Sequence, residues 1–468
     1  MAPPPFVLLK RLVEFLGGEE FTDDAGILVG WSTARHLSRG EAMEAMKAKL
    51  YLAELPQVSH MDMISPTPAH AQQMGSVPAA EISSTHKGVV VMYADFYRPG
   101  SDYSLYGRHL LYNASTNSLI AIPRLPQDSR YSPDIVSLGR SAVLVPAAGD
   151  DDDGYVLAEI VTSYEGVNPG LPDATIFTIK NPENVAVDGR EWVQSSTPQL
   201  PLPADLCGPD YYFQIDMAFS FQGRICWVDL LKGILFCDDV LSPQGPNLSF
   251  VSLPLGYSIN CHCDNRHQMV PLLQRSMSCV NGAIKFVALV GFGESSPDQV
   301  MLRTWVLSPN FKDWKEDTAA LSVEDIWDSD SYKQTGLPQL MPVSPVLSLT
   351  ENGVMYAILN EFERLPQVAP FRGPDGDDEV VAKANYMIRF NILQNKVLTC
   401  TKLSADGDLE WMMPDLIATD FTAYLEDHKI ASSELITKPA EGFLNKENSR
   451  CKALLCDEKV SMKNLYAL

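Results

Sequence analysis

The sequence predicts an all-β protein: a β-propeller of five recognisable four-stranded blades, with short helices near the N-terminus. Three observations lead to this prediction. Helical periodicity is scarce along the 468 residues, short apolar runs are bounded by Gly, Asn, Asp and Pro, and these runs recur as paired hairpins. Runs of this kind are typical of strands. Two hairpins make one antiparallel sheet, and a propeller repeats such sheets around an axis.

The first hairpin of each repeat is an apolar run, a glycine turn and a second apolar run. Two copies contain Asn-Gly, a dipeptide that favours a two-residue hairpin turn. A second hairpin with a polar turn follows each copy, as in "HLLYNASTNSLIAIPRLP". The glycines that mark the five first hairpins are Gly88, Gly139, Gly223, Gly282 and Gly353. Large aromatic side chains are expected to fill the interfaces between sheets, namely Trp227, Trp305, Trp314 and Trp327.

Three segments are expected. Residues 1–83 form a strand and helix segment that is a candidate to complete the propeller as a sixth blade, through "AGILVGWSTA" and "KLYLAELPQV". Residues 84–420 form the propeller, and residues 421–468 form a partly ordered tail. The best helix candidate is Ser38–Leu50, where Ser38 is a candidate N-cap and Glu41 follows three residues later. The alternative fold is an irregular pair of β-sandwiches or two barrels.

The stretch "WVDLLKGILFCDDV" (Trp227–Val240) decides how the carboxylates are interpreted. We expect one strand to end at Asp229, "LLKG" to turn the chain, and a second strand to return. At the first turn position an Asp side chain can accept from the backbone N–H two residues on. Asp238 and Asp239 then begin the next loop. This pattern predicts turn chemistry rather than catalysis.

The charge and the cysteines limit the classes of partner and compartment. The formal net charge is −23, which disfavours binding to phosphate backbones and to anionic membrane surfaces. The N-terminal segment does not have the order of charged and apolar residues of a signal peptide. Nine cysteines, an odd number, fit free thiols in a reducing compartment. We therefore expect an intracellular protein, cytoplasmic or nuclear, whose partner is another protein; the oligomeric state stays open.

One cluster could bind a metal. Cys261, Cys263 and His267 in "CHCDNRH" offer two thiolates and an imidazole to zinc. The Cys-X-Cys spacing is tighter than in structural zinc sites, so a loop between two blades is the preferred interpretation. "GFGESS" lacks the Lys and Ser/Thr of a phosphate-binding loop, and the acidic run Asp150–Asp153 lacks the spacing of a calcium loop. No catalytic, cofactor-binding or metal-binding residue is assigned.

Several phrases together resemble a plant family expanded in grasses, domain of unknown function sixteen-eighteen. They are "FVLLKRL", "YVLAEI", "REWV", "GRICWVDLLKGILFCDDVL", "LSFVSLPLG", "LRTWVLSPNFKDW", "VEDIW" and "VLSLTENGVMYAILN". The resemblance covers residues 5 to 400 and implies a plant protein without an assigned activity. The polar-turn hairpins are also similar to the blades of plant F-box-associated propellers. Residues 1–60 lack the apolar helical repeats of an F-box.

Two functions follow as hypotheses. The first is a non-enzymatic propeller that binds another protein through its loops, since loops on a rigid scaffold carry recognition. The alternative is a propeller hydrolase that acts on a sugar or small molecule and needs carboxylates converging on the central channel. Asp134 and Asp216, at the starts of candidate innermost strands, are the residues on which that alternative depends.

Overall fold

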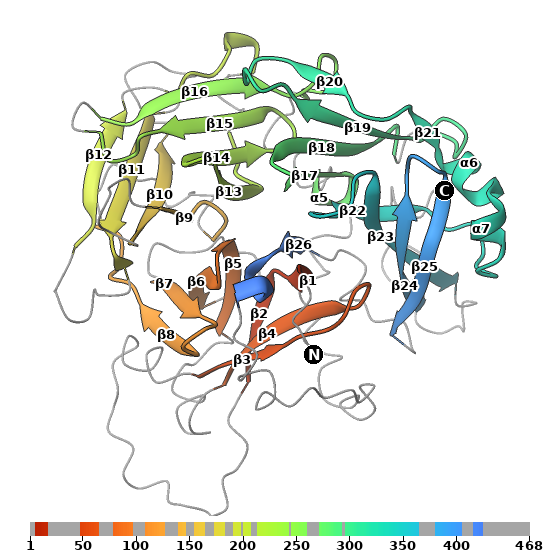
Figure 1. Cartoon of the computed structure of the whole chain (residues 1–468), viewed down its shortest axis with the longest axis horizontal. Helices are drawn as coiled ribbons and strands as arrows, with labels where there is room; N and C mark the ends of the chain where they lie inside the picture. The colour runs from red at the N-terminus through yellow and green to blue at the C-terminus, as the bar shows by residue number, and fades with distance from the viewer. Residues whose placement is uncertain are drawn as a thin grey trace, which may run out of the picture. The chain divides into compact units, whose positions relative to one another are not determined.

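A computed structural model describes the chain as predominantly β, with few short helices (Figure 1). The described residues are 5–16, 47–64, 78–96, 108–126, 139–146, 154–163, 173–182, 191–197, 200–206, 213–242, 245–259, 271–292, 295–364, 380–404 and 415–424. The chain divides into two compact units. Unit 1 comprises Met1–Leu52, Ser59–Arg266 and Thr419–Pro439, and unit 2 comprises Ala53–Val58, His267–Ala418 and Ala440–Leu468.

The first sheet of unit 1 joins the N-terminal strands to the first predicted pair of hairpins. Its strand order is β1-β4-β2-β5-β6-β7-β8, and β3 pairs with β4. β2 pairs antiparallel with β5, so the N-terminal strands extend this sheet. The bounds are β1 (Val7–Lys10), β2 (Leu12–Leu16), β3 (Lys47–Tyr51), β4 (Val58–Ile64), β5 (Pro78–His86), β6 (Val89–Phe96), β7 (Arg108–Asn113) and β8 (Ser118–Ala121).

The second and third sheets are antiparallel and four-stranded. The second has the order β12-β11-β10-β9, and the third has the order β13-β14-β15-β16. Their strands are β9 (Val143–Pro146), β10 (Tyr155–Ser163), β11 (Asp173–Lys180), β12 (Val193–Thr197), β13 (Met217–Phe221), β14 (Arg224–Asp229), β15 (Gly233–Asp238) and β16 (Asn247–Ser252). A short 3₁₀ helix, η2 (Ala204–Leu206), precedes the third sheet.

The second sheet is buried on both faces, which explains its almost continuous apolar runs. Successive side chains of a strand point to opposite faces. Leu144 accordingly packs into one core with residues of the first sheet. Its neighbours Val143 and Val145 pack into another core with residues of the third sheet. Figure 1 shows the second sheet (yellow) between the first (orange) and the third (green). Sheets therefore shield one another in unit 1, as the sequence predicts.

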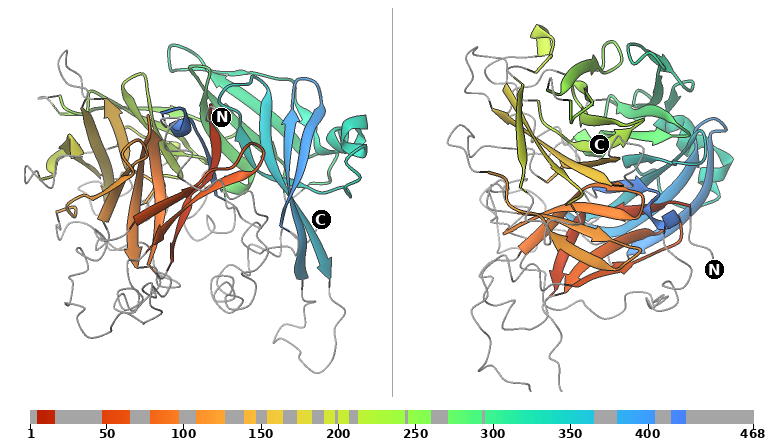
Figure 2. Two further views of the ribbon diagram at one scale, coloured as in Figure 1. Left: turned by 60° about the horizontal axis from the view of Figure 1, so that its bottom comes forward. Right: turned by 60° about the vertical axis from the view of Figure 1, so that its left-hand side comes forward.

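Unit 2 contains two further antiparallel sheets. The fourth has the order β17-β18-β19-β20 with β21 on β19, and the fifth has the order β22-β23-β24-β25. Their strands are β17 (Arg275–Val280), β18 (Ala283–Val290), β19 (Met301–Leu307), β20 (Trp314–Glu316), β21 (Leu321–Ser322), β22 (Pro342–Leu347), β23 (Val354–Arg364), β24 (Val380–Asn391) and β25 (Lys396–Ser404). After them in the chain come β26 (Leu416–Thr419), which is not a strand of these two sheets, and η4 (Phe421–Tyr424), which belongs to unit 1. In the fifth sheet, β23 and β24 pair with each other beyond the ends of β22 and β25 (Figure 2).

Short helices belong to the core of unit 2. They are α5 (Pro271–Gln274), α6 (Val323–Asp328) and α7 (Asp330–Lys333). Ser322 caps α6: its hydroxyl accepts from the Asp325 N–H, and the Asp325 side chain accepts from the Ser322 N–H. This reciprocal capping box satisfies two helix-end donors. Ile326 and Trp327 from α6 then join the core between the fourth and fifth sheets.

The expected place between sheets is confirmed for Trp227 and Trp327. Trp227 is fully buried in the core between the second and third sheets. Trp327 is buried in the core of unit 2, where its indole N–H donates to the Leu340 carbonyl at 2.9 Å. Trp305 is also buried and stacks on Phe286, whereas Trp314 is only partly buried. Large aromatic side chains thus fill gaps between and along the sheets.

One sequence prediction is wrong in the described residues. Lys47–Leu50 belong to strand β3 and pair with β4, so the helix predicted over Ser38–Leu50 does not extend there; residues 38–46 lie outside the described part. Tertiary pairing overrides local propensity at this place. The first arm of the hairpin predicted around Gly139 lies outside the described residues, and its second arm contains β9, which pairs with β10.

Candidate functional site

The carboxylate of Asp229 organises the turn between β14 and β15. Its Oδ1 accepts from the Leu231 N–H at 2.9 Å and from the Lys232 N–H at 3.2 Å. Its Oδ2 accepts from the Gln214 N–H at 3.0 Å. Asp229 is completely buried, and a buried backbone donor without a partner would be costly. The predicted contact with the residue two positions on is therefore confirmed, and the role of Asp229 is structural.

Asp216, a candidate channel carboxylate, accepts a hydrogen bond from the same turn. The β13–β14 ladder pairs Met217 with Val228, and the Asp216 N–H continues it by donating to the Val228 carbonyl at 2.9 Å. Asp216 therefore lies opposite Asp229. Its Oδ2 accepts from the Leu230 N–H at 2.7 Å, and the side chain is buried. Asp216 and Asp229 thus lie on paired strands, and both carboxylates accept backbone amides of the adjoining segments.

The other sequence candidates are placed as follows. Asp134, Cys261, Cys263 and His267 lie outside the described residues. The convergence of Asp134 with Asp216 that the hydrolase alternative needs therefore stays open, and the preferred loop interpretation of the cysteines stays a prediction. Asp150–Asp153 also lie outside them. Asp238 pairs with the Arg224 guanidinium at 2.8 Å. Asp239 takes a positive φ of 47°, in keeping with the loop start expected there.

Cysteines and metal ligands add no second site in the described residues. No disulfide joins Cys226, Cys237, Cys279 or Cys400 to another described cysteine. Burial, together with the nearby Asp238 and Asp239 carboxylates, raises the pKa of Cys237 to about 12, so its thiol stays protonated and unreactive. Nowhere in the described ranges do three His, Cys, Asp or Glu side chains gather as metal ligands would.

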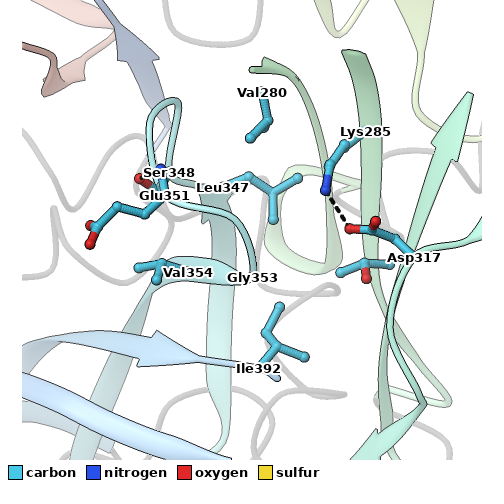
Figure 3. Close-up of a pocket in the computed structure, with 10 residues that line it drawn as sticks. Val280, Lys285, Asp317, Leu347, Ser348, Glu351, Gly353, Val354 and Ile392 are labelled. Carbon is cyan, nitrogen blue, oxygen red and sulfur yellow. Dashed lines mark hydrogen bonds and ion pairs between the residues drawn. The ribbon is translucent and has the colours of Figure 1, made fainter. Parts of the chain in front are cut away.

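A small pocket opens in unit 2, beside the hairpin turns of the fourth and fifth sheets (Figure 3). The space in and in front of it, open solvent included, is about 220 Å³, and its enclosed part holds about one water molecule. β18 and β19 supply one wall, and the turn between β22 and β23 supplies the opposite wall. The lining residues are Val280, Lys285, Thr304, Asp317, Leu347, Ser348, Glu351, Gly353, Val354 and Ile392.

One wall of the pocket is a buried ion pair. Lys285 Nζ donates to Asp317 Oδ2 at 2.5 Å and to Asn352 Oδ1 at 2.6 Å. The side chains of Lys285 and Asp317 are only 10% and 18% exposed. The Asp317 N–H donates to the Thr304 carbonyl at 2.9 Å, which fixes the carboxylate beside β19. A lysine in the apolar strand "AIKFVALV" has to be paired in this way because an isolated buried ammonium is costly.

The turn from Ser348 to Gly353 forms the facing wall. The Glu351 N–H donates to Ser348 Oγ at 3.2 Å, which holds the turn together. The Glu351 carboxylate points away from the centre of the pocket in Figure 3 and accepts from Arg389 at 2.5 Å. It is 43% exposed, so it presents negative charge near the pocket without filling it. Gly353 has a φ of 71°, a conformation that other residues rarely adopt.

The rest of the pocket is apolar. Val280, Leu347, Val354 and Ile392 contribute aliphatic surface around the ion pair (Figure 3). Leu393, the next residue after Ile392, is 56% exposed. Its side chain lies against Gly353, because a Cβ built there would come within 2.6 Å of the Leu393 side chain. An exposed leucine thus stands beside a small, largely apolar hollow that contains one charged pair.

Sequence reasoning did not identify this pocket. Lys285, Asp317, Asn352 and Ile392 are far apart in the chain, and only the packing of two sheets brings them together. One signal was present. Lysine is almost never buried without a partner, so a single Lys inside "AIKFVALV" indicates a paired or functional position. The sequence gives no indication of which acidic residue is its partner.

Fold and site together define a class: an all-β protein of repeated antiparallel sheets that contains a small, partly charged pocket. Within this class, residues 227–356 match the family described as "Protein of unknown function (DUF1618)". This match confirms the family resemblance over that span, which includes Lys285, Asp317 and Glu351. The grass origin and the likeness to F-box-associated blades stay predictions. No curated protein matches the sequence.

Some solved structures are distantly similar. A B. megaterium levansucrase mutant shares 10% identity over 69% of this chain and 84% of that chain, with a TM-score of 0.27. Zg3597, a family 117 glycoside hydrolase of Zobellia galactanivorans, shares 9% identity over 87% of this chain and 94% of that chain, with a TM-score of 0.29. Likenesses at this level carry no argument about function. In the described residues no helix is both long and apolar enough to cross a bilayer.

Proposed function

We propose that this protein is a non-enzymatic protein-interaction module whose sheets close into a β-propeller. The support for closure is the stacking inside each unit: the second sheet buries both faces against its neighbours, and the fourth and fifth sheets share a core. Stacked four-stranded antiparallel sheets are the building plan of propellers. A rigid disc of this kind presents turns and loops at its two ends, where a partner can dock.

The observation that carries the docking proposal is Leu393, whose side chain is 56% exposed and lies against the turn at Gly353. Sites for small-molecule substrates have volumes of about 300–1,000 Å³, whereas the enclosed part of the adjoining Lys285 pocket holds about one water molecule. The pocket is therefore too small for a substrate. Protein interfaces depend on a few apolar anchors surrounded by contacts that exclude water, and Leu393 is placed to be such an anchor.

The partner is proposed to be a basic protein segment that packs on Leu393 and the neighbouring turn. The net charge of −23 favours a positively charged partner surface. The same charge opposes binding of nucleic acid and of anionic membranes. The occupant is therefore a protein whose binding weakens as salt screens the attraction.

The experiment is a random-peptide display selection on the purified full-length chain. Individual peptides are then titrated against the wild type, Leu393→Ser and the matched control Leu255→Ser. Leu255 is likewise exposed, but it lies in the segment after β16, in unit 1. Loss of one buried leucine contact is worth about 1.5–3 kcal/mol. Leu393→Ser should thus weaken binding about tenfold or more, with the control unchanged.

Two results would contradict the proposal. In the first, the selection yields no peptide that binds the wild type. In the second, Leu393→Ser and Leu255→Ser weaken every peptide equally. The Asp216–Asp229 pair is the observation nearest to the sugar-hydrolase alternative. Since both carboxylates accept backbone amides, that pair supports a structural role more than catalysis.

A further inference from the structure

Three side chains of unit 2 bring an amine, a carboxylate and a carboxamide into contact. Lys285 Nζ donates to Asp317 Oδ2 at 2.5 Å and to Asn352 Oδ1 at 2.6 Å. A simple ion pair needs only the first of these contacts. The second places the lysine nitrogen beside the carbonyl carbon of Asn352, Cγ, because Oδ1 is bonded to that carbon. A nucleophile, a base and an electrophile therefore meet at one point.

The surroundings of Lys285 keep most water away from its amine. The side chains of Lys285 and Asp317 are only 10% and 18% exposed, and Figure 3 shows them together beside aliphatic residues of the pocket. The enclosed part of that pocket holds about one water molecule. A lysine attacks as the neutral amine, and desolvation beside a base is a usual way to activate it.

The amide of Asn352 lies in the turn that joins β22 to β23, directly before Gly353. Its hydrogen bond with Lys285 holds the amine and the carbonyl in contact before any reaction. Positioning of this kind replaces a chance encounter by a step within one molecule and lowers the barrier. Asn352 is exposed, so ammonia released from its side chain can reach solvent.

We propose that Lys285 and Asn352 join in an intramolecular isopeptide bond, with Asp317 as the catalytic base and acid. Asp317 takes one proton from the Lys285 ammonium, and the neutral amine attacks Asn352 Cγ. The Nζ–Cγ bond forms, the Cγ–Nδ2 bond breaks, and Nδ2 leaves with the electron pair of that bond. It receives the proton held by Asp317 and a second proton from Nζ, so it departs as ammonium. Asp317 is again a carboxylate, and nothing is oxidised or reduced.

The bond connects β18 of the fourth sheet to the β22–β23 turn of the fifth sheet, within unit 2. The two residues it joins are 67 positions apart in the chain. A covalent link across such a loop restricts the unfolded chain, as a disulfide does, but thiol reductants do not break it. This stabilising role is independent of the proposed docking at Leu393.

The direct test is the intact mass of the purified full-length chain. Release of one ammonia lowers the mass by about 17 Da, and tandem mass spectrometry of a tryptic digest should find the peptides of Lys285 and Asn352 joined. A wild-type mass equal to that of the sequence would overturn the proposal. A gain of about 1 Da at Asn352 in its place would also overturn it, because the side-chain amide would then have been hydrolysed after attack by the Gly353 nitrogen.

Variants assign the roles of the three residues. Lys285→Met keeps an unbranched side chain and removes the nucleophile, so the loss of about 17 Da should disappear. Asp317→Asn keeps the shape and removes the base, so the bond should form about a hundredfold more slowly. Lys333→Met is the matched control, since Lys333 also pairs with a carboxylate, that of Asp328, but both are exposed; the link should form as in the wild type.

Persistence of the mass loss in Lys285→Met would overturn the proposal, because a succinimide or another residue would then be its source. Equal rates of bond formation in Asp317→Asn and the wild type would reject Asp317 as the catalytic group. If Lys285→Met fails to fold, the digest of the wild type still decides, since the joined pair of peptides is either present or absent.

Discussion

Asp62 shows how one residue couples the first sheet to pH. It lies on β4, directly across from Glu14 on β2 and from Lys49 on β3. Burial, and secondarily the negative charge of Glu14, raises the pKa of Asp62 to about 6 from 3.8. Lys10, Lys49 and a hydrogen bond from Tyr51 act in the opposite direction but do not cancel the effect of burial. The folded protein therefore binds a proton here more readily than the unfolded chain does.

The sign of the pH dependence follows from this difference. Because the pKa is higher in the folded state, Asp62 contributes stability that is fully present below about pH 4 and is lost as pH rises to about 6. A difference of about two units corresponds to about 3 kcal/mol at most. We expect Asp62→Asn, which stays neutral, to raise the stability of unit 1 at pH 7.5 and to change it little at pH 4.

The measurement is thermal unfolding of the wild type and Asp62→Asn at the two pH values. Asp205→Asn is a control, since that side chain is exposed on η2. An equal effect of Asp62→Asn at pH 4 and pH 7.5 would show that the titration of Asp62 does not contribute to stability.

Single residues also differ in how far the sequence predicts them. The turn role of Asp229 follows from the local pattern, because its carboxylate accepts from backbone N–H groups two and three residues further on. The contact with Gln214 and the reciprocal role of Asp216 require the β13–β14 register. Lys285 is conspicuous in its apolar strand, but its partners Asp317 and Asn352 lie 32 and 67 residues further on. Local sequence carries no information about that pairing.

At the scale of the element, two glycines of the third sheet have different constraints. Gly233 begins β15, and a Cβ there would lie 2.2 Å from the Val251 carbonyl oxygen and 2.7 Å from the Phe250 ring. β16 thus approaches β15 too closely for any side chain. Gly223 lies in the β13–β14 turn with a φ of 78°, and a Cβ there would meet nothing within 4 Å. Its constraint is conformational only.

We therefore expect Gly233→Ala to destabilise unit 1 by more than about 3 kcal/mol, since the backbone of β16 must move. Gly223→Ala should cost about 1–2 kcal/mol, the usual penalty for an L-residue at positive φ. Urea denaturation of both variants measures the difference. If Gly233→Ala is no worse than Gly223→Ala, the close approach of β15 and β16 is not a constraint on folding.

Elements were predicted where turn residues and apolar runs agree. β14 and β15 lie where "ICWVD" and "ILFC" indicated strands, and the turns near Gly88, Gly223, Gly282 and Gly353 join hairpins. β3 differs because Lys47–Leu50 belong to a sequence with helical spacing, yet they pair with Met61–Ile64. There a partner distant in sequence decides the outcome.

At the scale of the whole molecule, the N-terminal strands are part of the first sheet. A variant that lacks residues 1–83 would cut β5 (Pro78–His86) and remove β2, which pairs with β5. It would also remove the buried side chains Val7, Leu8 and Val13. We expect this variant to lose hydrogen-exchange protection in β6 and β7. A variant that lacks residues 425–468 removes no described strand and should keep that protection.

Hydrogen exchange followed by mass spectrometry measures the amide protection of each peptide in both variants. Full protection of β6 and β7 without residues 1–83 would mean that residues 84–420 fold independently, as the sequence-derived boundary suggests. Loss of protection would show that the fold begins with the N-terminal strands.

The sequence by itself determined the all-β class, the hairpin repeat, the family resemblance of residues 227–356 and the turn role of Asp229. Each depends on patterns within a few residues, where apolar alternation and turn chemistry act directly. Only the tertiary structure decided the pairing of β2 with β5, the double burial of the second sheet and the pocket around Lys285. Those features depend on contacts between segments that are dozens of residues apart, and burial free energy selects such contacts without leaving a local pattern in the chain.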